Sequence, residues 1–386
     1  MGSLTDRKKP QIQLYYLVTA IFWFSNYAYI PTMSPYLKSI GISYAAIGVI
    51  GGAYGLAQIL LRVPAGILSD RIGRRKIFII AGALFGMLSS LGLYFTTNAM
   101  WIGLMRFLSG VSASTWVVYT ILFASYFAGD STASKLSYLN MANTAGIMAA
   151  KLLGSFAVER WGYRSAFLLS AAVGLAGVLL SIFITENIPE TAARPSVLEL
   201  LSVIRDKNLL TISVLAGISQ MLVFATTNTF TPELAAVLGA DSVQLGVLST
   251  LSTVAMMFTA MICGRLFRKR INLRMFMAAS FLMQAAGTVM TAYAPNVTAV
   301  YIASAVAGLG FGFCYVCAIG HCTLTVDPEK RSVAMGFFQA IYSVGMFAGP
   351  IVIGLAAQLA GLSRAIALSA LLAAAGMVLA LVVIRK

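Results

Sequence analysis

The chain has 386 residues, of which 59% are hydrophobic and only 10% are charged. Soluble domains carry about 25% charged residues, so this composition excludes an ordinary water-soluble fold and indicates a protein surrounded by lipid. The net charge of +15 would suit a nucleic-acid-binding protein, but the basic residues are spread between apolar stretches instead of forming one patch, which argues against a nucleic-acid partner.

Apolar stretches long enough to cross a membrane, about 20 residues each, recur along the whole sequence. They predict an all-α membrane protein with twelve transmembrane helices. The expected spans are 12–34, 44–69, 77–97, 99–123, 136–158, 163–185, 208–232, 243–266, 274–293, 297–323, 332–356 and 362–384.

Lys and Arg residues are distributed unevenly between the two ends of these spans. One side is expected to hold most of them, and the other holds only Lys38, Arg160, Arg164 and Arg364. Because cytoplasmic loops are enriched in Lys and Arg, both termini are expected in the cytoplasm. No cleavable signal peptide is visible, so we expect a multi-pass protein of a bacterial cytoplasmic (plasma) membrane.

The second half of the sequence repeats features of the first half. Six spans per half predict that both halves share one orientation. We expect an N-terminal bundle over 1–185, a cytoplasmic linker over 186–207 and a C-terminal bundle over 208–386. A capping box at Ser196–Glu199 predicts a short amphipathic helix in the linker, and an unstructured tether is the alternative. The matching pairs are Asn26 and Asn228, Gly110 and Gly308, Gly146 and Gly345, and Arg164 and Arg364.

The loop between the second and third spans carries the most specific motif, which runs from Gly66 to Lys76 and reads GILSDRIGRRK. It resembles the G-x-x-x-D-R-x-G-R-[RK] signature of the major facilitator superfamily of secondary transporters. Arg106–Ala113 resembles the R-x-x-x-G-x-x-A element of the fourth span in that family. The resemblance implies two pseudo-symmetric six-helix bundles, alternating access, a monomeric carrier of a small molecule, and no enzymatic activity.

The resemblance also implies that this loop is part of a gate. Gly66 would allow a close helix contact, Asp70 would face the N-terminus of the eleventh span, and Arg74 would pair with Asp130. A role in setting topology alone is the alternative. The expected gate residues are Arg62, Gly66, Asp70, Arg71, Gly73, Arg74 and Asp130.

Three cations are predicted inside spans, namely Arg62, Arg106 and Lys151. A charge in the hydrocarbon costs at least about 2.5–3.5 kcal/mol, so each is a functional candidate. Arg106 and Lys151 lie at similar depth, each roughly 12 Å from the expected outer end of its helix. They favour an anionic substrate such as a carboxylate or phosphate, while helix packing, snorkelling and a gate role for Arg62 are the alternatives.

Lys151 also bears on the type of transporter. It stands where drug antiporters of the resembled family carry the proline of a G-x-x-x-G-P motif in the fifth span. That motif occurs instead in the eleventh span, at Gly345–Pro350. This difference argues against drug efflux.

Polar and aromatic residues are the remaining candidates for the substrate site. In the resembled family the first, fourth, seventh and tenth spans line the cavity. Gln220, Phe224 and Asn228 follow at four-residue spacing and should share one helical face. Together they favour an organic, partly apolar anion, with ordinary packing as the alternative. The full set is Asn26, Tyr27, Trp116, Tyr119, Gln220, Phe224, Asn228, Gln339 and Tyr342.

The energy source is expected to be a proton gradient. No nucleotide-binding G-x-x-x-x-G-K-[ST] motif occurs, and Glu233 and His321 are the candidate proton carriers. Uniport and exchange stay open, and no cofactor or metal is expected. The leading hypothesis is a proton-coupled transporter of an organic anion. A proton-coupled efflux antiporter for drugs or amphiphilic metabolites is the alternative, with a lipid-headgroup flippase or a receptor of transporter-like fold as further candidates.

Overall fold

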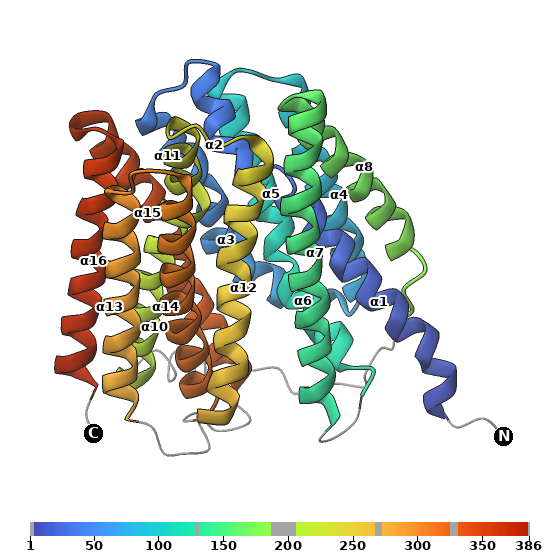
Figure 1. Ribbon diagram of the computed structural model, residues 1–386. Coiled ribbons are helices and arrows are strands. Elements are labelled where there is room, and N and C mark those ends of the chain that lie inside the picture. Colours follow the sequence, from blue (N-terminus) through green and yellow to red (C-terminus); the bar gives the residue numbers. More distant parts are fainter. Residues whose placement is uncertain (1–3, 128–130, 187–205, 267–271, 325–330, 385–386) are drawn as a thin grey trace. The chain divides into compact units, whose positions relative to one another are not determined.

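The computed structural model describes residues 4–127, 131–186, 206–266, 272–324 and 331–384, and every regular element in these ranges is a helix (Figure 1). Eleven helical stretches among them are long and apolar enough to cross a membrane. The remaining expected span, 12–34, is divided between α1 and α2. The all-α membrane fold predicted from composition is therefore confirmed.

The helices follow the expected spans to within a few residues. Three expected spans are interrupted: 12–34 between Tyr27 and Ile30, 99–123 at Thr115, and 208–232 by the π-helix η1. In the first half the helices are α1 Leu4–Tyr27, α2 Ile30–Ser39, α3 Tyr44–Ile72, α4 Arg75–Phe95, α5 Ala99–Ser114, α6 Trp116–Ala124, α7 Ser131–Trp161 and α8 Arg164–Ser181. In the second half they are α10 Lys207–Ala225, η1 Thr226–Phe230, α11 Thr231–Val237, α12 Ser242–Leu266, α13 Leu273–Ala292, α14 Val297–Leu324, α15 Arg331–Ala360 and α16 Leu362–Val383.

Polar residues in the short connections set several of the helix ends. The Asn98 side chain accepts hydrogen bonds from the backbone N–H groups of Met100 and Trp101, and so caps the start of α5. Asp206 caps α10 in the same way. Such caps satisfy the free N–H groups of a first helical turn. Gly73, with a φ of +69°, allows the reversal between α3 and α4.

Two compact units make up the chain. One contains residues 1–30 and 60–192, and the other contains 31–59 and 193–386. Residues 31–59, which the sequence assigns to the N-terminal bundle, pack with the second half. The division into bundles at 186–207 stays a prediction, and the amphipathic linker helix falls on 187–205, outside the described residues.

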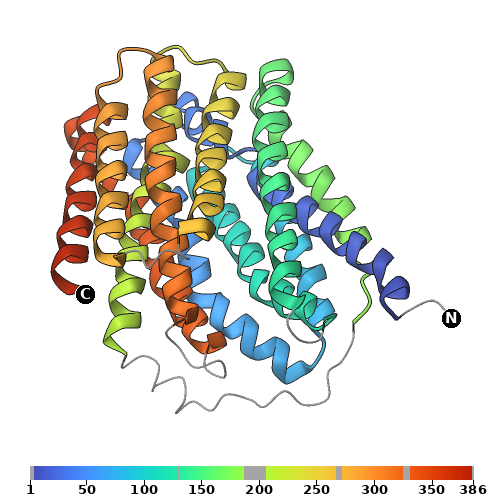
Figure 2. The ribbon, with the colours of Figure 1, turned by 60° about the horizontal axis from the view of Figure 1, so that its bottom comes forward.

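The internal repeat is visible in the packing of each unit. In the first unit, α1 packs against α7, and α4 packs against α5 and α8. In the second unit, the equivalent α10 packs against α15, and α13 packs against α14 and α16. Figures 1 and 2 show α13 beside both of these helices. The same pairing scheme in both units agrees with the repeat read from the sequence.

Glycines explain one pair of these contacts. A Cβ atom at Gly146 on α7 would overlap the backbone of Ala20 on α1, and a Cβ at Gly345 on α15 would overlap the backbone of Gly217 on α10. Gly154 makes a second contact of this kind, with Ala28. The repeated glycine is therefore needed for helix backbones to touch.

The first half of α3 attaches to the second unit by a similar contact. Gly52 and Gly55 face α15, where added Cβ atoms would lie 2.5 Å from the carbonyl oxygen and the amide nitrogen of Phe347, respectively. Gly48 faces the backbone of Pro350. This backbone-to-backbone packing explains why residues 31–59 group with the second half.

We predict that Gly146→Ala lowers the apparent melting temperature of the purified protein. The new methyl group has backbone as its neighbour, and overpacking of this kind costs about 1–3 kcal/mol. Gly336→Ala on α15 is the matched control, because a Cβ there meets nothing within 4 Å. Equal melting temperatures for the two variants would contradict the packing described for α1 and α7.

Candidate functional site

Arg106 is held inside the first unit by hydroxyl groups. It lies on α5 with 6% of its surface exposed. Its Nη1 donates to Tyr29 Oη at 3.0 Å and to Ser109 Oγ at 3.4 Å. The guanidinium carbon is 5.6 Å from the centre of the Tyr29 ring. These partners orient the guanidinium without carrying an opposite charge.

The same network continues into α1. Ser109 Oγ donates to Asn26 Oδ1 at 3.2 Å, and Asn26 Nδ2 donates to Ser112 Oγ at 3.3 Å and to the Phe22 carbonyl at 2.9 Å. Asn26 thus connects α1 to two residues of α5. A buried network of this kind fixes the directions of its members.

Lys151 reaches the same turn of α1 from α7. It has 4% of its surface exposed, and its Nζ lies 6.0 Å from the centre of the Tyr27 ring. Gly146 and Gly154 hold α7 against α1 on either side of it. Residues 26–29, at the end of α1 and in the turn that follows it, therefore lie close to both buried cations. Sequence reasoning placed Arg106 and Lys151 at similar depth but did not reveal this shared turn.

The third cation, Arg62, is also buried, on α3. Its assignment to a gate stays a prediction.

An aromatic cluster adjoins Lys151. The Trp116 ring lies 5.9 Å from Tyr119 and 5.3 Å from Trp23, and Trp23 lies 5.8 Å from Tyr27. Sequence reasoning did not select Trp23, although its spacing of four residues from Tyr27 places both on one face of α1. Tyr119 is fully buried and donates to the Ile79 carbonyl at 3.4 Å, which is the setting of a packing residue.

Residues selected in the second unit do not form one stripe. Gln220 and Phe224 are buried on α10, but Asn228 lies in η1, where the i to i+5 backbone pattern breaks the four-residue periodicity. Thr229 Oγ1 donates to the Phe224 carbonyl at 2.7 Å, five residues back. The sequence alone does not predict a π-helix at this position.

Aromatic contacts hold two other selected residues of this unit. Phe224 stacks on Tyr54 of α3, with ring centres 5.8 Å apart. Tyr342 packs edge-on against Phe338, with ring centres 5.5 Å apart. Gln339, which follows Phe338 in α15, is partly buried.

Glu233 is buried in the first turn of α11. It shares a side-chain hydrogen bond with Tyr44. The ammonium group of Lys38 lies 4.3 Å from the centre of the Tyr44 ring, and its charge acts on Glu233. The second candidate proton carrier, His321, is partly buried in the last turn of α14.

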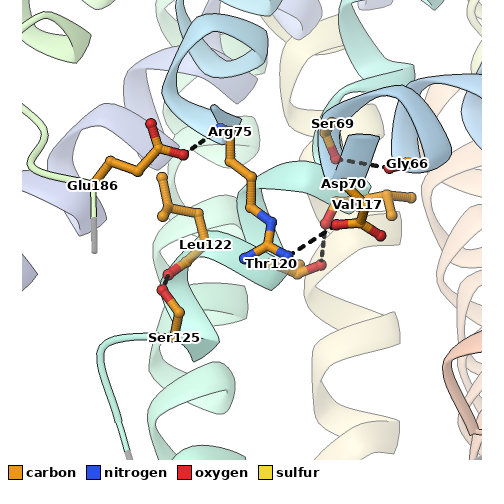
Figure 3. A network of polar contacts seen from close by, with 9 residues as sticks. All are labelled: Gly66, Ser69, Asp70, Arg75, Val117, Thr120, Leu122, Ser125 and Glu186. Carbon is orange, nitrogen blue, oxygen red and sulfur yellow. Dashed lines mark hydrogen bonds and ion pairs between the residues drawn. The ribbon is translucent and has the colours of Figure 1, made fainter. Parts of the chain in front are cut away.

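The loop motif is organised around Arg75 (Figure 3). Its Nη2 forms an ion pair with Asp70 Oδ1 at 2.9 Å, and its backbone N–H donates to the Glu186 carboxylate. Sequence reasoning selected Arg74 as the pairing residue, but Arg74 and Arg71 are both exposed. The expected partner Asp130 lies outside the described residues.

Gly66 has no close backbone neighbour among the residues described. A Cβ there would meet only the side chain of Val117, at 3.8 Å. The expected gate role of Gly66 stays a prediction.

A profile of the Major Facilitator Superfamily matches residues 15–233 and again 212–386. The chain belongs to this superfamily. It is therefore a multi-pass membrane protein with the family and fold of a secondary transporter.

Individual superfamily members resemble the chain to different extents. An uncharacterized MFS-type transporter of Methanocaldococcus jannaschii is 21% identical over 358 residues, which cover 88% of this chain and 89% of that protein. The multi-drug resistance efflux pump PmrA of Streptococcus pneumoniae is 29% identical over 191 residues, and the match covers 46% of this chain and 47% of the pump. The chain thus matches about half of that pump's length.

A solved structure shares the fold along almost the whole chain. It is a bacterial homolog of the human lysosomal transporter Spinster, in an inward-facing and occupied conformation. The TM-score is 0.81 at 13% identity, and the match covers 98% of this chain and 97% of that chain.

We predict that the Asp70–Arg75 pair contributes little to stability. Asp70 is about half exposed, at 46%, and water screens such pairs to about 0–1 kcal/mol. A double-mutant cycle with Asp70→Asn and Arg75→Gln should therefore give a coupling energy of no more than about 1 kcal/mol in thermal unfolding. A much larger coupling would contradict this geometry, and Arg71→Gln, in an exposed residue of the same loop, is the control.

Proposed function

We propose that the protein carries an organic anion with a carboxylate or phosphate group across the cytoplasmic membrane by alternating access, coupled to proton movement. The observation that carries the proposal is the burial of Arg106 and Lys151 beside residues 26–29, at the end of α1 and in the turn after it. A monomer with both termini in the cytoplasm is part of the proposal.

The energetics of burial favour an anionic ligand. Charged side chains are costly inside a membrane and are found mainly where they bind substrates or ions. Coulomb attraction is stronger in a low-dielectric interior than in water. A guanidinium can also donate two parallel hydrogen bonds to a carboxylate or phosphate. The hydroxyls of Tyr29 and Ser109 hold the Arg106 side chain in place for such an encounter.

The neighbouring rings favour an organic anion over an inorganic one. Tyr27 and Trp116 lie in the aromatic cluster next to Lys151. Ligand sites combine apolar and aromatic walls with a few polar groups that fix orientation. A small hydrated ion would gain nothing from these walls.

Glu233 is the proposed proton carrier, with His321 as the second candidate. The carboxyl of Glu233 is buried on α11. The two residues that act on it, Tyr44 and Lys38, come from the segment 31–59. A change in the position of that segment would change the charge environment of the carboxyl. Such a change is what couples proton binding to a conformational equilibrium.

Efflux of amphiphilic drugs is the second candidate function. It is favoured by the similarity to the efflux pump PmrA. Lys151 argues against drug efflux. It stands where drug antiporters of this superfamily carry the proline of the G-x-x-x-G-P motif in the fifth span.

We predict that organic anions raise the melting temperature of the purified protein and that Arg106→Gln and Lys151→Gln each weaken their binding about tenfold or more. A lost hydrogen bond to a charged group costs about 1.5–3 kcal/mol, and each tenfold loss corresponds to 1.4 kcal/mol. The screen uses monocarboxylates, dicarboxylates, organophosphates and the lipophilic cation tetraphenylphosphonium.

The control for this screen is Arg164→Gln, which removes an exposed cation at the start of α8. It should bind like the wild type. Stabilisation by tetraphenylphosphonium alone would refute anion transport and support drug efflux instead.

We predict that Glu233→Gln abolishes proton-driven uptake in proteoliposomes but leaves exchange of internal for external substrate intact. The amide cannot gain or lose a proton, yet it can still hydrogen-bond to Tyr44. The control is Glu159→Gln, in an exposed residue at the end of α7. Uptake by Glu233→Gln that still follows the pH gradient would exclude this residue as the carrier and leave His321 to be tested.

A further inference from the structure

Trp23 carries a buried N–H group that has no hydrogen-bond acceptor in the part of the chain that the structure describes. The side chain is 7% exposed, and its Nε1 has no hydrogen-bond partner among the described residues. Buried N–H groups in folded proteins are nearly always paired, so an exception requires an explanation. A bound substrate that accepts this hydrogen bond is one.

The surroundings of Trp23 have the composition of a ligand site. Its ring packs edge-on against Trp116, with centres 5.3 Å apart and an interplanar angle of 73°, and lies 5.8 Å from Tyr27. The Lys151 ammonium is a further neighbour of Tyr27, 6.0 Å from the ring centre. The indole ring of Trp23 and a buried cation therefore both lie next to the same tyrosine.

The two donors stand on a rigid support. Trp23 and Tyr27 lie on the stretch of α1 between Ala20 and Ala28, whose backbone touches Gly146 and Gly154 of α7. Lys151 lies on α7 between these two glycines. Because both backbones are fixed at these points, the donors keep their spacing, which is what selective recognition requires.

We propose that the Trp23 indole N–H and the Lys151 ammonium bind one acidic group of the substrate, and that the rings of Tyr27 and Trp116 contact a flat apolar part of it. The substrate class is an aromatic carboxylic acid. This inference rests on the proposed function and makes Trp23 a specificity-determining residue. Aromatic rings prefer offset or edge-on contact with other rings, which gives a flat arene an advantage over an aliphatic group.

The binding experiment uses the full-length purified protein and three matched probes. Phenylacetate carries both features, phenylacetamide lacks the charge, and cyclohexylacetate lacks the aromatic ring. We expect phenylacetate to bind at least about tenfold more tightly than phenylacetamide, because the amide offers no negative charge to the buried ammonium. It should bind about threefold to tenfold more tightly than cyclohexylacetate, because an aliphatic ring cannot make the edge-on aromatic contacts.

The decisive variant is Trp23→Phe, which keeps an aromatic ring and removes the N–H. It should weaken phenylacetate binding about tenfold and phenylacetamide binding less, because a hydrogen bond to a carboxylate is stronger than one to a neutral carbonyl. Trp101→Phe is the matched control, because Trp101 is 52% exposed at the start of α5. It should bind all three probes like the wild type.

A second measurement does not depend on the stability of Trp23→Phe. The chain has 4 Trp residues, and Trp101 and Trp161 are both exposed. A Trp101→Phe, Trp161→Phe protein retains only Trp23 and Trp116, so its emission reports the buried pair. Phenylacetate should change this emission, and the change should be absent when Lys151→Gln is added.

The outcomes separate this inference from the proposed function. If phenylacetate binds Trp23→Phe as tightly as the wild type, or leaves the emission unchanged, the role of Trp23 is refuted and anion transport stands. If organophosphates or cyclohexylacetate bind as well as phenylacetate, the substrate class is refuted. If no organic anion binds the wild type, the proposed function fails and this inference fails with it.

Discussion

Backbone contact between α1 and α7 is the constraint on which the candidate site depends. Gly146 and Gly154 allow α7 to touch α1 at Ala20 and Ala28, and any side chain at either glycine would force the helices apart. Lys151 lies between these glycines and faces Tyr27. Two residues further along the chain, Tyr29 accepts a hydrogen bond from Arg106 of α5. Helix packing therefore places both cations beside one short stretch of chain, residues 26–29.

The repeat shows how one framework can serve two purposes. The pair α10 and α15 repeats the contact of α1 and α7, with Gly345 in the place of Gly146. The position equivalent to Lys151 is Pro350, which packs against Gly48 of α3 instead of carrying a charge. In the first unit this position carries an ammonium group, and in the second its backbone packs closely against Gly48 of α3. Similar folds of the two halves thus leave their chemistry free to differ.

The sequence predicts the helices well and the contacts between side chains poorly. Long apolar stretches define the spans because lipid permits few alternatives to a helix. The repeat glycine Gly146 was also recognisable. By contrast, the sequence did not single out Arg75, the residue that pairs with Asp70, from the other basic residues of the loop, because neighbouring positions of one basic run point in different directions. The π-turn at Asn228 and the unpaired N–H of Trp23 depend on tertiary packing, which periodicity does not encode.

Helix α3 links the two ends of the proposed mechanism. Tyr44, the partner of Glu233, begins this helix, and Asp70, the partner of Arg75, lies near its end. The helix passes from one compact unit to the other between Ile59 and Leu60. Pro64 lies one turn further along, and because proline has no N–H, the carbonyl of Leu60 loses its helical hydrogen bond. The helix α3 therefore lacks one backbone hydrogen bond next to the residues where the two compact units divide.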